Sequence, residues 1–188
     1  MVGKLILVVG PSGAGKDSLI AAAKRYFAGN EKISFPRRVI TRPPSPAAED
    51  HDTLSNEDFV KALQQGAFFM HWHAHELSYG LPISLADDLD AGKTVIVNVS
   101  RTVLAQAEKA WPHSTVLEIT APPQILAQRV TARARGEDGD VQKRISRTVE
   151  AAPDHLPRIT ISNDKSLAEA EVAFCAVLEK LITDKGTA

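Results

Sequence analysis

The chain has 188 residues, of which 44% are hydrophobic, so it is long enough to bury one core and form a single domain. Its formal net charge of −1, from 22 basic and 23 acidic residues, provides no overall field that would attract nucleic acid or an anionic membrane, and neither is expected as a partner. The single cysteine, Cys175, excludes an internal disulfide framework and favours a reducing compartment, for which the cytoplasm is our expectation.

The first predicted element is a buried strand at residues 5–9. This apolar run is too short for the apolar part of a signal sequence or for a membrane span. A glycine-containing break at residues 10–15 follows, and apolar residues then recur at helical spacing over residues 16–27. The pattern predicts a strand, a loop and a helix in succession.

The rest of the chain also alternates between helical and extended patterns. A helix is predicted to begin at Ser55, because Ser55 and Asp58 have the spacing of a capping box. Strands that alternate with helices predict an α/β fold, in which a parallel sheet is covered on both faces and ligands bind at the carboxyl ends of the strands. The later strands and their following helices are predicted at residues 94–99 and 101–109, 115–119 and 122–133, and 158–161 and 167–182.

The loop after the first strand matches the Walker A motif, in which two glycines five residues apart are followed by a lysine. Main-chain N–H groups of such a loop bind phosphate oxygens, and the start of the next helix adds partial positive charge. Lys16 is the first candidate for a catalytic residue, since its ammonium can bridge the β- and γ-phosphates of ATP. The predicted nucleotide-binding residues are Gly10, Pro11, Ser12, Gly13, Ala14, Gly15, Lys16, Asp17 and Ser18.

Position 17 departs from the motif. Asp17 stands where the motif has Ser or Thr as a magnesium ligand, and Ser18 follows it. A carboxylate is a hard oxygen ligand, so Asp17 can bind Mg²⁺ directly or through water. Alternatively, Ser18 supplies a hydroxyl one residue later. The sequence leaves both assignments open.

Motifs along the chain resemble the guanylate kinase superfamily, over about residues 4–180: the Walker A loop, Ile40-Thr41-Arg42, Glu49, Trp72 with Tyr79-Gly80, Arg133, Arg144 and Asn163-Asp164. The resemblance implies a P-loop nucleoside-monophosphate-kinase fold with a parallel five-stranded sheet, and it implies ATP and Mg²⁺ as cofactors. It also implies that the single domain consists of a core at residues 1–34 and 92–188, an acceptor-binding region at about 35–91 and a lid at about 133–144.

In that superfamily an arginine and a tyrosine hold the acceptor's phosphate, and these roles carry over to Arg42 and Tyr79. The guanine-reading parts differ. Ser45 replaces a second arginine, a stretch that ends in tyrosine is shortened to residues 48–52, and a strand-end aspartate appears as Asn98. A guanine site that lacks its acceptors leaves N–H groups of the base unpaired, at roughly 1–3 kcal/mol each. These changes argue against efficient phosphorylation of guanylate.

A second set of motifs closely resembles the ribose 1,5-bisphosphate phosphokinase family: Gly-Lys-Asp-Ser at residues 15–18, Arg38-x-Ile-Thr-Arg42, Glu49-x-His51, Asn98-x-Ser-Arg101 and Asn163-Asp164-x-Ser-Leu. This resemblance implies ATP-dependent phosphorylation of ribose 1,5-bisphosphate to 5-phosphoribosyl 1-diphosphate in phosphonate breakdown. A sugar bisphosphate has no base to be read, but its phosphates and hydroxyls suit arginines and short polar groups. We therefore expect Arg38, Arg42 and Arg101 to bind acceptor phosphates, and Glu49, His51 and Asn98 to serve hydroxyls or orientation.

The acceptor in this interpretation is a phosphate oxygen that is already ionised, so no general base is needed. Catalysis then rests on positioning and charge neutralisation. Arginines of the lid are candidates for the second role; Arg133 and Arg144 fit the family pattern best, and Arg135 and Arg147 are further candidates. The alternative is that these arginines are solvated or pair with the acidic residues Glu137, Asp138 and Asp140.

Three further features have more than one interpretation. His71, His73 and His75 alternate in a predicted extended segment, a spacing that can bind zinc, but no fourth ligand is evident and we expect a surface or lining role. Cys175 is expected to be a core side chain of the last helix. Asn163-Asp164 follows the last predicted strand and lies either on the adenine side of ATP or in a simple turn that leads to Ser166 as a helix cap.

Two other functions remain open. One is a guanylate kinase or another nucleoside monophosphate kinase, and the other is a non-catalytic guanylate-kinase-like binding module. The Walker A lysine and the arginine-containing lid argue against the module, because binding alone would need neither.

Overall fold

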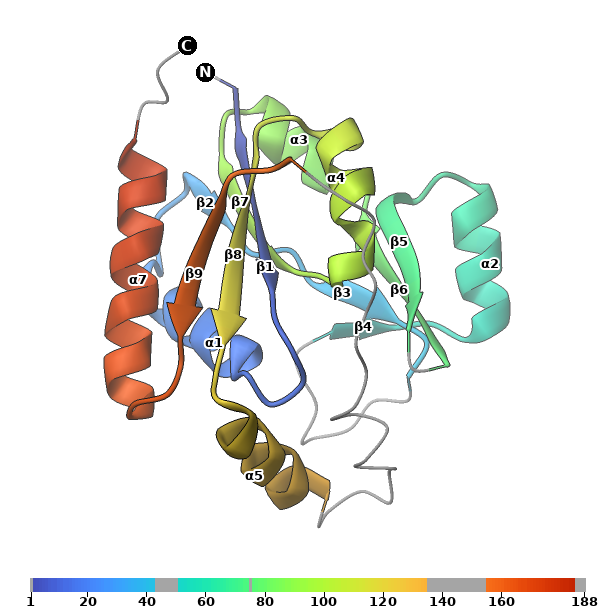
Figure 1. Ribbon diagram of the computed structural model, residues 1–188. Helices are drawn as coiled ribbons and strands as arrows, with labels where there is room; N and C mark the ends of the chain where they lie inside the picture. Colours follow the sequence, from blue (N-terminus) through green and yellow to red (C-terminus); the bar gives the residue numbers. More distant parts are fainter. Residues whose placement is uncertain (1, 43–50, 75, 135–154, 185–188) are drawn as a thin grey trace.

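The computed structural model describes residues 2–42, 51–74, 76–134 and 155–184 of the protein. The centre of the molecule is a five-stranded sheet with the order β2-β7-β1-β8-β9, in which all the neighbouring strands are parallel (Figure 1). The predicted α/β class and parallel sheet are confirmed. The strands are β1 (Lys4–Val9), β2 (Ile33–Ser34), β7 (Thr94–Asn98), β8 (Ser114–Thr120) and β9 (Arg158–Ser162).

Helices cover both faces of this sheet, because the strands are apolar on both sides. Alternate residues of β1 point to opposite faces: Ile6 and Val8 pack with α1 (Lys16–Tyr26) and α7 (Leu167–Thr183). Leu5, Leu7 and Val9 pack with α3 (Leu85–Asp90) and α4 (Leu104–Ala110). Full burial of such a side chain stabilises the fold by about 1.5–3 kcal/mol.

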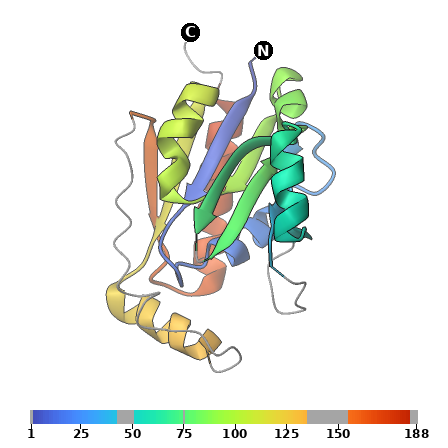
Figure 2. The ribbon, with the colours of Figure 1, turned by 90° about the vertical axis from the view of Figure 1, so that its right-hand side faces the viewer.

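A second, four-stranded sheet with the order β4-β3-β6-β5 stands beside the first (Figures 1 and 2). Its Met70, Trp72 and Leu81 belong to the same apolar cluster as α3 and α4, so the two sheets share one core. Helix α2 (Asn56–Gln64) flanks it, with Phe59 stacked on Phe68 at 4.6 Å between ring centroids. The strands are β3 (Arg38–Ile40), β4 (His51–Thr53), β5 (Phe68–Ala74) and β6 (Leu77–Pro82).

The helix boundaries follow local chemistry. Ser55 caps α2 by accepting a hydrogen bond from the main-chain N–H of Asp58 at 3.0 Å, as predicted. Ser166 and Glu169 form a full capping box at the start of α7. The helix predicted at residues 101–109 is instead a 3₁₀ turn, η1 (Arg101–Val103), followed by α4, because the Ser100 hydroxyl accepts from the N–H of Thr102 and tightens the first turn.

The carboxyl ends of the central strands meet at one edge of the sheet. The loop after β1 and helix α5 (Pro123–Ala134) lie at this edge, and the start of β1 and the end of α7 lie at the opposite one (Figure 1). This is the edge at which parallel sheets bind ligands. None of the helices within the described ranges is long and apolar enough to cross a membrane.

Candidate functional site

The loop between β1 and α1 has a backbone that only glycine adopts readily. Gly10, Gly13 and Gly15 have φ angles of 153°, 83° and 88°. A Cβ atom on Gly10 would lie 2.2 Å from the carbonyl oxygen of Ile119, so the loop can leave the sheet only where no side chain intervenes. Gly15 is the N-cap of α1 and has no side chain that could satisfy the first N–H groups of the helix. These donors therefore stay available for an anion.

Lys16 folds back across this loop. Its Nζ donates hydrogen bonds to the carbonyl oxygens of Gly10 at 2.9 Å and of Pro11 at 3.1 Å. The half-buried ammonium thus lies over the turn that contains Pro11 and Ser12. An ammonium has three donors, so phosphate oxygens that entered the turn would compete for it with these carbonyls.

Asp17 and Ser18 point to different sides of the start of α1. Asn98, at the carboxyl end of β7, donates from its Nδ2 to Oδ1 of Asp17 at 2.7 Å. Ser18 lines a cavity on the side of α5. Asn98, which we expected to serve the acceptor, is therefore bonded to the nucleotide loop's helix, with only 8% of its surface exposed.

Arg38 connects the two sheets. Its Nη1 donates to the main-chain oxygen of Asn98 at 3.2 Å, and its guanidinium lies 5.6 Å from the centroid of the Tyr79 ring. Tyr79 is stacked on Trp72 with the rings nearly parallel and their centroids 5.3 Å apart. A cation over an aromatic face is attracted by the ring quadrupole, by about 0.5–2 kcal/mol. The three side chains form a packed wall beside β7.

Arg42 lies two residues after the end of β3, the strand that carries Arg38. Ile40 pairs with Tyr79 across the β3–β6 ladder, and Thr41 and Ser78 exchange two hydrogen bonds, one main-chain at 3.1 Å and one to the Thr41 hydroxyl at 2.9 Å. These bonds fix the end of β3, from which half-buried Arg42 continues. The structure therefore brings Arg38 and Tyr79 together on paired strands, with Arg42 just after the end of β3.

The two remaining acceptor candidates within the described ranges are His51 and Arg101. His51 is partly buried in β4, opposite Arg38 in the register. Arg101 is bound by Glu118 of β8, with Nη2 and Oε1 2.9 Å apart, and Arg158 approaches the other carboxylate oxygen at 3.6 Å. The buried Nε of Arg101 has no hydrogen-bond partner among the described residues. The sequence did not single out Glu118.

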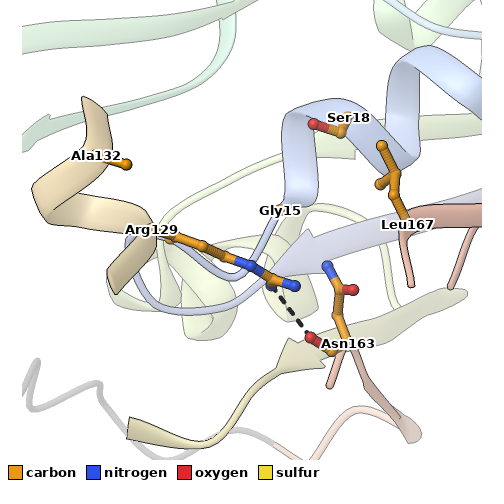
Figure 3. A pocket seen from close by; sticks show the side chains of 7 residues that line it. Gly15, Ser18, Arg129, Ala132, Asn163 and Leu167 are labelled. Atoms are coloured by element: carbon orange, nitrogen blue, oxygen red, sulfur yellow. Dashed lines mark hydrogen bonds between the residues drawn. The ribbon is translucent and has the colours of Figure 1, made fainter. Parts of the chain in front are cut away.

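A cavity of about 330 Å³ opens between the loop, α5 and the segment after β9 (Figure 3). Asn163 forms its inner wall and is 98% buried, with 2% of its surface exposed. The Asn163 amide nitrogen donates to the carbonyl of Ala14 at 2.8 Å, and Arg129 of α5 donates to the Asn163 main-chain oxygen at 3.1 Å. Oδ1 of Asn163 is buried without a partner in the described structure. The cavity is lined by Gly13, Gly15, Ser18, Arg129, Ala132, Asn163 and Leu167.

The interpretation of Asn163-Asp164 as a turn that leads to a helix cap is confirmed, whereas a place on the adenine side of ATP stays a prediction. Asn163 contacts the loop, and Ser166, three residues later, caps α7. Sequence reasoning missed Arg129. It is one of several arginines in its region, and only the position of α5 below the sheet edge distinguishes it (Figure 1).

Several candidates lie outside this arrangement. Glu49 and Arg144 are outside the described residues, as are Arg135, Arg147 and most of the predicted lid, while Arg133 falls in the last turn of α5. His71 and His73 are exposed on β5, and the described ranges contain no group of three His, Cys, Asp or Glu side chains that could hold a metal ion. Cys175 packs in the core, as expected, and burial raises the pKa of its thiol.

Comparisons with known proteins agree with this fold. The guanylate kinase family model matches residues 2–179. A ribose 1,5-bisphosphate phosphokinase of Bradyrhizobium diazoefficiens is 50% identical over 150 residues, or 80% of this chain and 75% of the relative. A second ribose 1,5-bisphosphate phosphokinase, from Methylobacterium radiotolerans, is 43% identical over a match that covers 95% of this chain and 98% of the relative. A guanylate kinase structure from Anaplasma phagocytophilum has the same fold, with a TM-score of 0.66 over 98% of this chain and 88% of that one, at 17% identity.

Proposed function

Because the chain belongs to the guanylate kinase family, we propose that it is an ATP-dependent kinase that converts ribose 1,5-bisphosphate to 5-phosphoribosyl 1-diphosphate and releases ADP. The observation that carries the proposal is the high identity, over nearly the whole chain, to relatives with that name. The site supports it, because the strand end holds the neutral amide Asn98, whose Nδ2 donates to Asp17. An amide offers one acceptor oxygen where a carboxylate offers two, and a sugar bisphosphate has no base N–H groups that need such acceptors.

The nucleotide is expected to lie along the start of α1. Its phosphate oxygens would accept hydrogen bonds from the N–H groups of the loop and from the ammonium of Lys16. Its base would enter the cavity beside Arg129 and Asn163. The buried and unpaired Oδ1 of Asn163 is suited to accept a hydrogen bond from an amino group there.

Mg²⁺ fits the donors at this position. The first turn of α1 offers the carboxylate of Asp17 and the hydroxyl of Ser18, and Mg²⁺ is commonly held by one or two carboxylates together with phosphates and water. When bound, the ion neutralises charge on the β- and γ-phosphates.

The acceptor is proposed to lie against the wall formed by Arg38, Trp72 and Tyr79, with Arg42 at its edge. Its attacking phosphate oxygen needs no base, so these residues bind and orient it. Arg101, Glu49 and His51 remain proposed acceptor contacts, and Arg133 and Arg144 remain the proposed catalytic arginines of the lid.

The acceptor assignment is tested by ADP release, measured side by side with ribose 1,5-bisphosphate, ribose 5-phosphate, GMP and AMP. We expect kcat/KM for ribose 1,5-bisphosphate to exceed that for GMP by about a hundredfold or more, since unpaired groups of the guanine would each cost a factor of ten or more. Phosphorus NMR should show a new diphosphate in the product. Faster turnover of GMP would instead identify a nucleoside monophosphate kinase, and no turnover of any acceptor would favour the binding module.

Tyr79→Phe tests the acceptor wall. The phenylalanine ring keeps the stack on Trp72 but removes the hydroxyl, so we expect KM for the acceptor to rise about tenfold, which is the value of a hydrogen bond to a charged group. KM for ATP should not change. Tyr26→Phe is a matched control, because Tyr26 is exposed at the C-terminal end of α1, where its hydroxyl donates to Glu179 of α7. An unchanged acceptor KM in Tyr79→Phe would remove that hydroxyl from the site.

A further inference from the structure

We infer that Asp17 is the protein ligand of the nucleotide's Mg²⁺ and that Asn98 is a positioning residue, which fixes the Asp17 carboxylate for this task. The inference rests on the proposed function, since it assumes that a nucleotide with a divalent cation binds the loop. It also decides between Asp17 and Ser18, which the sequence alone did not.

Asn98, which donates the hydrogen bond to Asp17, is anchored in the sheet. Asn98 is the last residue of β7, aligned with Val8 of β1 in the parallel register. The next residue, Val99, donates its N–H to the Val8 oxygen at 3.0 Å, and Arg38 holds the Asn98 carbonyl. With its main chain fixed on both sides and its side chain buried, Asn98 can direct its amide at Asp17 in one orientation.

The carboxylate of Asp17 has a second oxygen that Asn98 does not occupy. Asn98 occupies Oδ1 of Asp17 at 2.7 Å, and among the described residues no other side chain donates to this carboxylate. Asp17 is only partly buried and directly follows Lys16. Oδ2 is therefore a hard oxygen ligand, held next to the residue expected to contact the phosphates. Ser18 points instead to the cavity beside Arg129 and Asn163.

The negative charge of Asp17 should affect the affinities for metal-free and metal-bound nucleotide in opposite directions, which the neutral hydroxyl of a serine would not do. A carboxylate at the start of the phosphate-binding helix repels the phosphates of a metal-free nucleotide and attracts the cation of a metal-bound one. If Asp17 merely stabilised the helix N-terminus, its removal would not change these two affinities in opposite directions. The two affinities therefore separate a ligand from a structural residue.

Asn98 has a distinct expected signature. Because it acts only through Asp17, its removal should have no effect once the Asp17 charge is gone. A double-mutant cycle measures this coupling. Asn98 would be neutral in the cycle only if it acts through Asp17.

The experiment measures the binding of Mn²⁺ with a non-hydrolysable ATP analogue by electron paramagnetic resonance, and the binding of the same analogue in EDTA by calorimetry. Asp17→Asn keeps the shape and the bond to Asn98. It should weaken Mn²⁺ binding about a hundredfold and leave metal-free binding equal or tighter, and Asn98→Leu should weaken Mn²⁺ binding about tenfold. The double variant should resemble Asp17→Asn. Asp90→Asn removes the same charge at the exposed end of α3 and should change neither affinity.

Equal weakening of metal-bound and metal-free binding in Asp17→Asn would overturn the metal role, and this variant is conservative enough to fold. Additive effects of the two substitutions would overturn the positioning role of Asn98. A wild-type protein that binds the analogue in neither condition would instead contradict the proposed function itself, so the two failures can be told apart.

Discussion

Replacing Lys16 with methionine is expected to lower kcat about a thousandfold, with a smaller loss of ATP affinity. Methionine keeps most of the length of the side chain but removes the ammonium, which lies over the turn through its bonds to Gly10 and Pro11. Charge neutralisation aimed at a transferring phosphoryl group typically accounts for two to three orders of magnitude in rate. The effect should fall mainly on kcat, because negative charge shifts toward the leaving group as the γ-phosphoryl is transferred.

Steady-state kinetics with ATP and ribose 1,5-bisphosphate measures this loss. Lys109→Met is the control, because Lys109 is an exposed lysine of α4 outside the site. Turnover of Lys16→Met within tenfold of the wild-type value would mean that this lysine does not neutralise the transferring phosphate.

The second large effect is expected at Gly15. Its φ is 88°, and an added Cβ would lie 2.5 Å from Nδ2 of Asn163. Alanine would therefore strain the backbone and also displace the amide that holds the Ala14 carbonyl, which leaves buried polar groups unpaired at roughly 1–3 kcal/mol. We expect Gly15→Ala to weaken ATP binding about a hundredfold, as measured by calorimetry.

Gly29→Ala is a closely matched control. Gly29 has nearly the same backbone conformation, with φ at 81°, but nothing lies within 4 Å of an added Cβ. Both variants carry the strain of a left-handed alanine, about 1–2 kcal/mol. Only Gly15→Ala changes the loop's contact with Asn163. Equal effects of the two variants on ATP binding would show that backbone strain alone is responsible and that the Asn163 contact is irrelevant.

The parts of the fold that sequence reasoning predicted are those with a local signal. The apolar run of β1, the glycines after it and the N-cap at Ser55 each specify structure within a few residues. The short strands β3 and β4 have no such signal. β4 pairs with β3 alone, and β3 pairs with β6, which lies about 40 residues away in the chain; this explains why the second sheet was not predicted.

The same distinction applies to the site. The nucleotide loop is contiguous, so its motif was visible in the sequence. The contacts of Asp17 with Asn98 and of Arg101 with Glu118 join residues that only the strand order brings together. Arg129 was missed for this reason. In the sequence it is an ordinary helical arginine, and its role emerges from the position of α5 beside Asn163.

The most direct test of the account is a crystal structure with Mg²⁺ and a non-hydrolysable ATP analogue. We predict that the phosphates fill the turn at residues 10–15 and that Nζ of Lys16 leaves the carbonyl oxygens of Gly10 and Pro11 to bind a phosphate oxygen. An analogue bound elsewhere, with Lys16 still bonded to those two carbonyls, would contradict a kinase that uses this loop.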